Sequence, residues 1–146
     1  MLPKIIGRKE KISLPKLGLS LVWAKIDTGA YSSSLHAEEI REEEVGGLKV
    51  LKFQVLMAGH PKFSGKTVTA KKYRQKKVKN SFGQAEVRFL IETEIRIAGE
   101  TYKAEFTLSD RSNMKNSILL GRKVLRERFL VDVTKTNLGK AYRHKK

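Results

Sequence analysis

The feature that most constrains this chain is a short apolar run that ends in a carboxylate, residues 19–30. It reads Leu-Ser-Leu-Val-Trp-Ala-Lys-Ile-Asp-Thr-Gly-Ala. Because the run is short and apolar on both parities, it predicts a central β-strand that is buried on both faces. A carboxylate at the end of such a strand is costly unless it is hydrogen-bonded or functional. Asp27 is therefore the first candidate for a catalytic residue.

The residues after Asp27 predict a tight turn around its carboxylate. Gly29 allows the backbone to turn sharply and to point amide groups at the carboxylate. The Thr28 hydroxyl can hold the turn in place. Asp, Thr and Gly are also common in ordinary turns, so these residues alone fit either a catalytic turn or a plain connection between a strand and a loop.

Composition restricts the chain to a small, strongly basic domain. Its 146 residues include 31 Lys and Arg against 15 Asp and Glu, a net charge of +16 that attracts polyanions. The chain has no cysteine, which excludes disulfides and thiol catalysis. We find no signal peptide and no membrane-spanning window, so we expect a cytoplasmic protein without a membrane partner. We expect one domain over residues 1–135 and a basic, solvated tail over 136–146.

Alternating apolar and polar residues predict a mainly β fold. We expect strands over 4–14, 19–26 and 48–57, a long hairpin over 87–108, and strands over 118–121 and 129–133. The segment from Arg122 to Arg128 is the one convincing helix. This number of strands suits a small closed barrel with one short C-terminal helix.

The order of the motifs resembles retroviral-type aspartic proteases, in which Asp-Thr-Gly-Ala is the active-site signature. Those proteins have a later pair or trio of apolar residues followed by Gly, often Arg, and a short helix, which 118–128 matches. A closer match covers nearly the whole chain. It is similar to the bacterial family often called "ATP-dependent zinc protease", retropepsin-like proteins associated with ATP-grasp glutamate ligases. The blocks that carry this likeness are 7–10 with 14–15, 24–30, 34–37, 108–111 with Met114, 119–122 and 129–132.

The resemblance implies an aspartic endopeptidase with an all-β, retropepsin-like barrel. Asp27, Thr28 and Gly29 would form the catalytic turn and Ala30 would contact substrate. Structural support would come from Leu120, Gly121, Arg122 and Asp110. Viral enzymes carry an acidic partner for this Arg just after Asp-Thr-Gly-Ala, where Tyr31 and Ser32 stand here. We predict Asp110 as the replacement partner of Arg122, the alternative being a solvated arginine.

The number of carboxylates predicts a homodimer. Aspartic proteases need two carboxylates that share one proton. The other two aspartates, Asp110 and Asp132, are not followed by Thr-Gly. The second carboxylate must therefore be Asp27 of a second copy, on a two-fold axis.

We expect no cofactor and no metal, despite the zinc in the family label. Catalytic zinc usually takes three protein ligands, and closely spaced histidines are the usual sign. His36, His60 and His144 are far apart in the sequence. His36 beside Leu35 suits a packed, hydrogen-bonded side chain better.

A run of basic residues at 71–79 is a second candidate for function. It is either a solvated face or part of a flap, where cations above the cleft would favour an acidic peptide. Poly-glutamate is the substrate that the association with ligases implies. The candidate substrate contacts are Lys71, Lys72, Arg74, Lys76, Lys77, Lys79 and Gly83.

Two functions remain open. The first is a dimeric aspartic endopeptidase that cleaves acidic or poly-glutamylated peptides, with a link to an ATP-grasp glutamate ligase. The second is a non-catalytic binding module that docks on RNA or ribosome through its basic surface. Cleavage would depend on Asp27, whereas phosphate binding would depend steeply on salt and not on Asp27.

Overall fold

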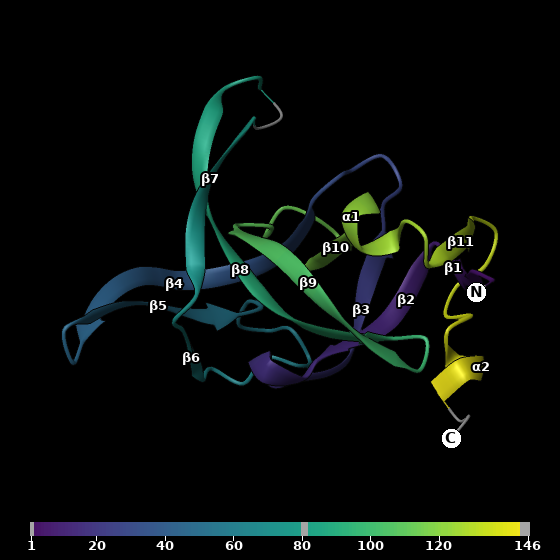
Figure 1. Ribbon diagram of the computed structural model, residues 1–146, viewed down its shortest axis with the longest axis horizontal. Coiled ribbons are helices and arrows are strands. Elements are labelled where there is room, and N and C mark those ends of the chain that lie inside the picture. Colours follow the sequence, from purple (N-terminus) through teal and green to yellow (C-terminus); the bar gives the residue numbers. More distant parts are fainter. Residues whose placement is uncertain (1, 80–81, 144–146) are drawn as a thin grey trace.

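The computed structural model describes residues 2–79 and 82–143, and β-strands dominate it (Figure 1). The strands are β1 (Lys4–Gly7), β2 (Lys9–Leu14), β3 (Leu19–Ile26), β4 (Ser33–Val45), β5 (Leu48–Val55), β6 (Thr67–Ala70), β7 (Tyr73–Lys79), β8 (Ala85–Ile97), β9 (Glu100–Ser109), β10 (Ile118–Leu120) and β11 (Phe129–Asp132). The short helices are a 3₁₀ turn η1 (Pro15–Leu17), α1 (Arg122–Leu125) and α2 (Lys140–Arg143).

Six strands form a closed circuit of pairings around the core. The order is β10-β3-β2-β8-β9-β4, and β10 also pairs with β4, which closes the circuit. The short β10 therefore lies between β3, to which it is parallel, and β4, to which it is antiparallel. This arrangement brings the end of β3 next to a segment more than 90 residues later in the chain.

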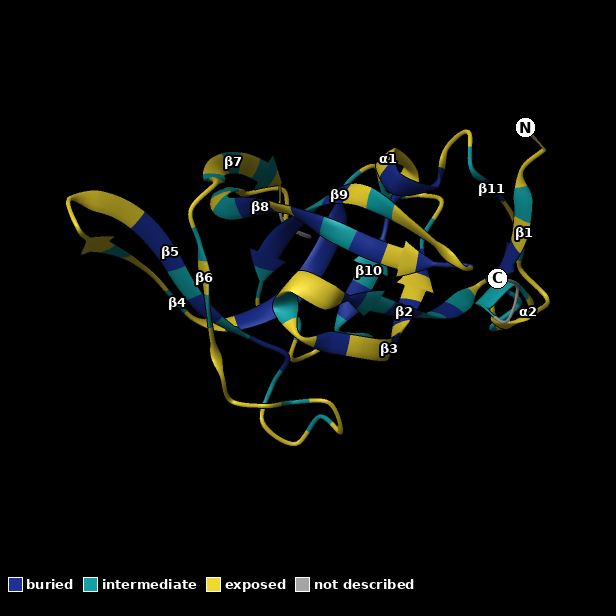
Figure 2. Cartoon of the chain, turned by 60° about the horizontal axis from the view of Figure 1, so that its bottom comes forward, coloured by how far each residue is buried: buried dark blue, intermediate teal, exposed yellow. Residues whose placement is uncertain are grey.

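Alternation along the strands fills the interior with apolar side chains. In β8, Ile91, Ile95 and Ile97 are buried, and Phe106 of β9 faces them. β2 repeats this pattern with Ile12 and Leu14. Figure 2 shows buried residues along the circuit and exposed residues at the far ends of β4 and β5, which project as an arm.

Two elements extend from the circuit. The β7–β8 hairpin pairs Tyr73–Lys79 with Ala85–Ile91 and rises from the body in Figure 1. On the opposite side, β1 and β11 form a separate parallel ladder. Ile5 and Leu130 are directly paired in this ladder, and both are largely exposed.

The sequence predicted most of these elements. The mainly β fold is confirmed, and the hairpin expected over 87–108 is β8 and β9. The strand expected over 4–14 is instead two strands that break at Arg8, whose backbone N–H bonds the Lys135 carbonyl at 2.8 Å. The helix expected over 122–128 is one turn, Arg122–Leu125. None of the helices in the described ranges is long and apolar enough to cross a membrane.

The C-terminal segment was expected to be a solvated tail over 136–146, but its described residues, up to 143, pack on the domain. The Asn137 N–H donates to the Lys9 carbonyl at 2.8 Å, and Arg143 donates to the Lys11 carbonyl at 3.3 Å. The buried carboxylate of Glu10 accepts three backbone N–H groups, from Gly7 at 2.7 Å, Leu138 at 2.9 Å and Gly139 at 2.8 Å. Glu10 thereby fastens the C-terminal segment to β1 and β2.

Candidate active site

Asp27 lies directly after β3 and is fixed by its own backbone and by β10. Its N–H donates to the Leu120 carbonyl at 2.9 Å. The Gly29 N–H donates to Asp27 Oδ1 at 2.9 Å, so the turn orients the carboxylate as the sequence predicted. A Cβ at residue 29 would stand 3.3 Å from that oxygen, a tight contact that the glycine avoids. The Asp27 carboxylate is thus oriented by a hydrogen bond and remains partly accessible to solvent.

Gly121 and the start of α1 lock the loop that carries the turn. A Cβ at Gly121 would lie 2.5 Å from the Ser32 carbonyl oxygen and 2.6 Å from that of Tyr31. The first N–H groups of α1 have no partner inside the helix and bind this loop instead. Arg122 N–H reaches the Ala30 carbonyl at 2.8 Å, and Lys123 N–H reaches that of Tyr31 at 3.0 Å.

Arg122 has a different partner from the predicted one. Its Nη1 donates to the Thr28 carbonyl at 3.1 Å, and its guanidinium lies 5.9 Å from the Tyr31 ring centroid. Asp110 instead accepts the Ser112 N–H at 2.9 Å. These hydrogen bonds from Ser112 lower the pKa of the Asp110 carboxyl. The predicted Arg122–Asp110 pair is absent from the described contacts because the Tyr31 ring and a backbone oxygen satisfy the arginine.

His36 is buried and holds the loop that follows β9. Its Nδ1 accepts the Arg111 N–H at 2.7 Å, so the proton of the neutral ring is on Nε2, which lies 2.9 Å from Glu38 Oε2. Both ring nitrogens are engaged, as expected for a packed histidine. His60 Nδ1 accepts the Lys62 N–H at 3.0 Å, and His144 lies outside the described residues.

No metal cluster is evident in the described ranges. There, no three side chains of His, Cys, Asp or Glu come together in a group that could hold a metal ion. Asp27 and the fully engaged His36 belong to no such group among the described residues, so the side chains present do not fit a zinc site.

The structure separates the predicted basic contacts into distinct environments. Lys76 of β7 donates from Nζ to Ser32 Oγ at 3.0 Å, so it reaches the loop that follows Asp27. Arg74 is paired with Glu105 Oε2 at 3.0 Å. Lys77 and Lys79 are exposed on the other face of β7. Lys71 and Lys72, just before β7, are exposed and line a hollow of about 250 Å³ together with Arg74. Gly83 is exposed in the turn after β7.

Glu105 of β9 joins the base of the β7–β8 hairpin to α1. Its carboxylate pairs with Lys123 of α1 and with Arg74 of β7. The hydrogen bond from Lys123, together with the charges of Lys123, Arg74 and Lys76, lowers the pKa of the Glu105 carboxyl although burial opposes this shift. The ionised form is therefore favoured in the folded state.

Glu105→Gln should lower the free energy of unfolding at neutral pH by about 1 kcal/mol. Because the folded pKa is below the unfolded one, the stabilisation is present above the unfolded carboxyl pKa of about 4.3 and is lost as the pH falls through the folded pKa. Urea unfolding of the variant and of the natural protein should therefore converge in acid. Glu44→Gln, an exposed residue of the β4 arm, is the control. A Glu105→Gln deficit that is constant with pH would contradict the ion-pair account.

Sequence reasoning missed two cations linked to this site, namely Arg111, whose charge interacts with Asp27, and Arg88, whose charge interacts with Arg111. Burial lowers the pKa of the half-buried Arg111 guanidinium, Arg88 lowers it further, and the nearby Asp27 raises it. Arg111 belongs to the block 108–111 that carried the family likeness, which was the available signal. No sequence signal pointed to Arg88, because a charged residue is expected at the polar positions of a strand with alternating pattern.

Comparisons with known proteins agree with this geometry. The chain is 34% identical to a probable alpha-L-glutamate ligase of Desulfotalea psychrophila over 152 aligned residues, 95% of this chain and 32% of that protein. It is 32% identical to a probable alpha-L-glutamate ligase of Shewanella pealeana, over 88% of this chain and 28% of that protein. The chain thus spans about a third of the length of these curated relatives.

A solved structure and a family match extend the comparison. The crystal structure of protein Lpg0085 from Legionella pneumophila, of unknown function, superposes with a TM-score of 0.74 at 28% identity, over 93% of this chain and 98% of that one. Residues 5–141 match the family described as RimB-like, retropepsin-like aspartic endopeptidase RimB. With Asp27-Thr28-Gly29 held against Leu120-Gly121 as described, the chain belongs to this retropepsin-like family.

Proposed function

We propose that the protein is an aspartic endopeptidase that acts as a homodimer on acidic peptide segments. The observation that carries the proposal is the Asp27 turn, in which the Gly29 N–H orients a half-buried carboxylate while β10 fixes the backbone. Such a carboxylate can accept a proton from water while a protonated carboxyl polarises the scissile carbonyl. The attacking group is water, so no covalent intermediate forms.

The second carboxyl in this mechanism is Asp27 of another copy. Asp110 and Asp132 are engaged elsewhere, with Ser112 and with Thr134. An apolar hollow of about 310 Å³ beside Thr28 supports pairing on this side of the molecule. It is lined by Leu125, Phe129, Leu130 and Val131, with Arg122 and Arg126, and Leu130 is 58% exposed.

Two observations support an acidic substrate. The net charge of +16 attracts acidic peptides, Lys76 donates to Ser32 in the loop after Asp27, and the charge of Arg111 interacts with Asp27. The relatives are named as probable glutamate ligases, which is consistent with a functional link to glutamate addition. The direct test is incubation of the protein and its Asp27→Asn variant with peptides of glutamate, aspartate and glutamine, followed by mass spectrometry. Products that form equally with both proteins, or with neither, would refute the proposal.

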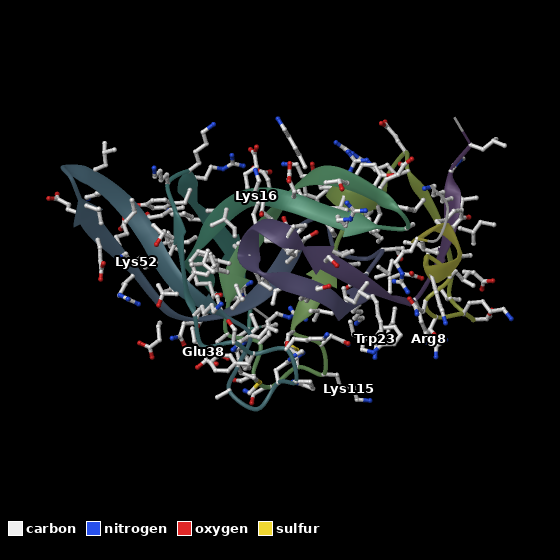
Figure 3. The ribbon with its side chains drawn as sticks, turned by 90° about the horizontal axis from the view of Figure 1, so that it is seen from below. Arg8, Lys16, Trp23, Glu38, Lys52 and Lys115 are labelled. Atoms are coloured by element: carbon white, nitrogen blue, oxygen red, sulfur yellow. The ribbon has the colours of Figure 1, made fainter. Side chains whose placement is uncertain are left out.

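A second candidate function, docking on RNA, is favoured by one surface. Trp23 on the outer face of β3 is 39% exposed, and the Lys9 and Lys11 ammonium groups lie 5.4 and 5.3 Å from its ring centroid. Lys25 is directly opposite Lys9 in the β2–β3 ladder. Like charges in this position repel unless an anion lies between them. Figure 3 shows Trp23 on the side of the molecule that also carries Arg8.

If this surface binds RNA, Trp23→Ala should weaken binding of a labelled single-stranded RNA by about tenfold, since one stacked base contributes about 1–3 kcal/mol. Affinity should also fall steeply with salt. Asp27→Asn serves as the control and should bind like the natural protein. Equal affinities of Trp23→Ala and the natural protein in a fluorescence anisotropy titration would exclude RNA docking at this face.

A further inference from the structure

Three cations from separate segments are linked to the loop that carries Asp27. They are Lys76 of β7, Arg88 of β8 and Arg111 of the loop between β9 and β10, here called the cation cluster. Lys76 donates to Ser32 of the loop that carries Asp27, the charge of Arg111 interacts with Asp27, and the charge of Arg88 interacts with Arg111. In Figure 1 the β9–β10 loop lies between the β7–β8 hairpin and the loop that joins β3 to β4. All three side chains are half-buried, in contrast to the exposed Lys77 and Lys79.

The register of the hairpin places two of the cations side by side. Lys76 and Arg88 are directly opposite in the antiparallel β7–β8 ladder, so their side chains project from the same face. The Lys76 bond to Ser32 shows that this face is turned toward the loop that follows Asp27. Arg88 is paired with Glu86 at 2.5 Å, and Lys76 has no ion pair among the described residues. A like-charged pair directly opposite costs stability unless an anion lies between the two groups.

Arg111 is held rigidly with its charge left available. Its N–H binds the buried His36, and its Nε donates to the Asn116 carbonyl at 3.0 Å. Its two terminal nitrogens have no partner within the described part of the chain, and it makes no ion pair there. A guanidinium presented in this way has the geometry to bind a carboxylate with both terminal nitrogens.

Among the described residues, the one carboxylate that pairs with a member of the cluster is Glu86, which binds Arg88. Glu105 is occupied by Arg74 and Lys123. Asp27 acts on Arg111 only through space, without an ion pair. Within the described residues, Lys76 and Arg111 therefore make no ion pair, and both are half-buried.

We infer that the cation cluster is the subsite for a substrate side-chain carboxylate next to the scissile peptide bond. This inference rests on the proposed function and assigns selection of the acidic residue to Lys76, Arg88 and Arg111 rather than to the basic strand 71–79 as a whole. Arg111 binds the substrate carboxylate with both terminal nitrogens. Lys76 and Arg88 of the β7–β8 hairpin contact the same carboxylate from the hairpin side. His36 is a positioning residue, because it fixes the Arg111 backbone.

Binding to a catalytically inactive protein tests the subsite separately from cleavage. The probe is fluorescein-labelled hexaglutamate, titrated by anisotropy against the Asp27→Asn protein and against the same protein with one added substitution. Lys76→Gln and Arg111→Gln should each raise Kd at least about tenfold, because each removes a charge-assisted contact. Arg88→Gln should raise Kd less, because Arg88 is already paired with Glu86. Arg111→Lys keeps the positive charge but cannot bind a carboxylate with two nitrogens, so it should raise Kd less than Arg111→Gln does. Thermal unfolding of each variant verifies that it is folded.

Two matched variants make the result specific. Lys77→Gln removes the same charge from the opposite face of β7, and Lys115→Gln removes an exposed charge near Arg111 that points away from the body in Figure 3. Both should change Kd less than twofold. Equal losses for Lys77→Gln and Lys76→Gln, or unchanged Kd in folded cluster variants, would overturn the subsite. The expected binding pattern together with no cleavage by the natural protein would support the subsite and refute the protease.

Discussion

Asp27→Asn should reduce hydrolysis of a glutamate-rich peptide by at least about a thousandfold while leaving the fold intact. An amide cannot take a proton from water, and general acid–base catalysis contributes about 10²–10⁴ in rate. Its Oδ1 can still accept the Gly29 N–H, so the turn should persist. The measurement is kcat/KM from product formation by mass spectrometry, with circular dichroism and thermal unfolding as the check on folding.

Mixing experiments extend this prediction to the homodimer. If each site needs Asp27 from two copies, an excess of Asp27→Asn protein should suppress the activity of a fixed amount of natural protein as mixed dimers form. A monomeric enzyme would be unaffected by the added variant. Full activity of pure Asp27→Asn would exclude the aspartic mechanism altogether.

Glu10→Ala should lower the free energy of unfolding by about 3–5 kcal/mol, which is a large share of the stability of a small domain. The substitution leaves the N–H groups of Gly7, Leu138 and Gly139 without their acceptor around a fully buried position. Such unpaired groups cost about 1–3 kcal/mol each. Chemical denaturation at neutral pH measures the loss.

Two comparisons make the Glu10 result interpretable. Glu94→Ala removes a surface carboxylate whose contact with Lys16 is 3.9 Å, and it should cost less than about 1 kcal/mol. Glu10→Gln should fall between the two, because an amide oxygen replaces one acceptor and the NH₂ faces the remaining donors. A loss for Glu10→Ala no greater than that for Glu94→Ala would mean that this carboxylate does not fasten the C-terminal segment.

Local pattern predicted several strands but was wrong about the burial of β3. This strand was expected to be buried on both faces, yet Leu21 and Trp23 are 41% and 39% exposed, so it is buried on one face. The alternation of Val87, Phe89 and Ile91 against charged neighbours predicted β8, and its continuation predicted β9. The Asp27 turn followed from the chemistry of Gly29 alone. The likeness to retropepsin-like proteins, which drew on several separate blocks, is confirmed by the match over residues 5–141, whereas the label "ATP-dependent zinc protease" is not supported by that match.

Long-range contacts account for what the sequence did not reveal. Nothing near Glu10 in the chain indicates that its acceptor sites are filled by Leu138 and Gly139, more than 120 residues away. The C-terminal segment was predicted to be a solvated tail because its partners on β1 and β2 are equally distant in the sequence. Arg111 and Arg88 lie on different elements, so only the folded chain brings Arg111 to Asp27 and Arg88 to Arg111.

The insertion of β10 between β3 and β4 has a consequence during synthesis. The backbone of Asp27 has its hydrogen-bond acceptor at Leu120, and the loop after it is clasped by Gly121 and Arg122. A nascent polypeptide released only as far as β9 lacks every one of these restraints. The loop that carries Asp27 can therefore reach its final conformation only after residues 118–122 have left the ribosome.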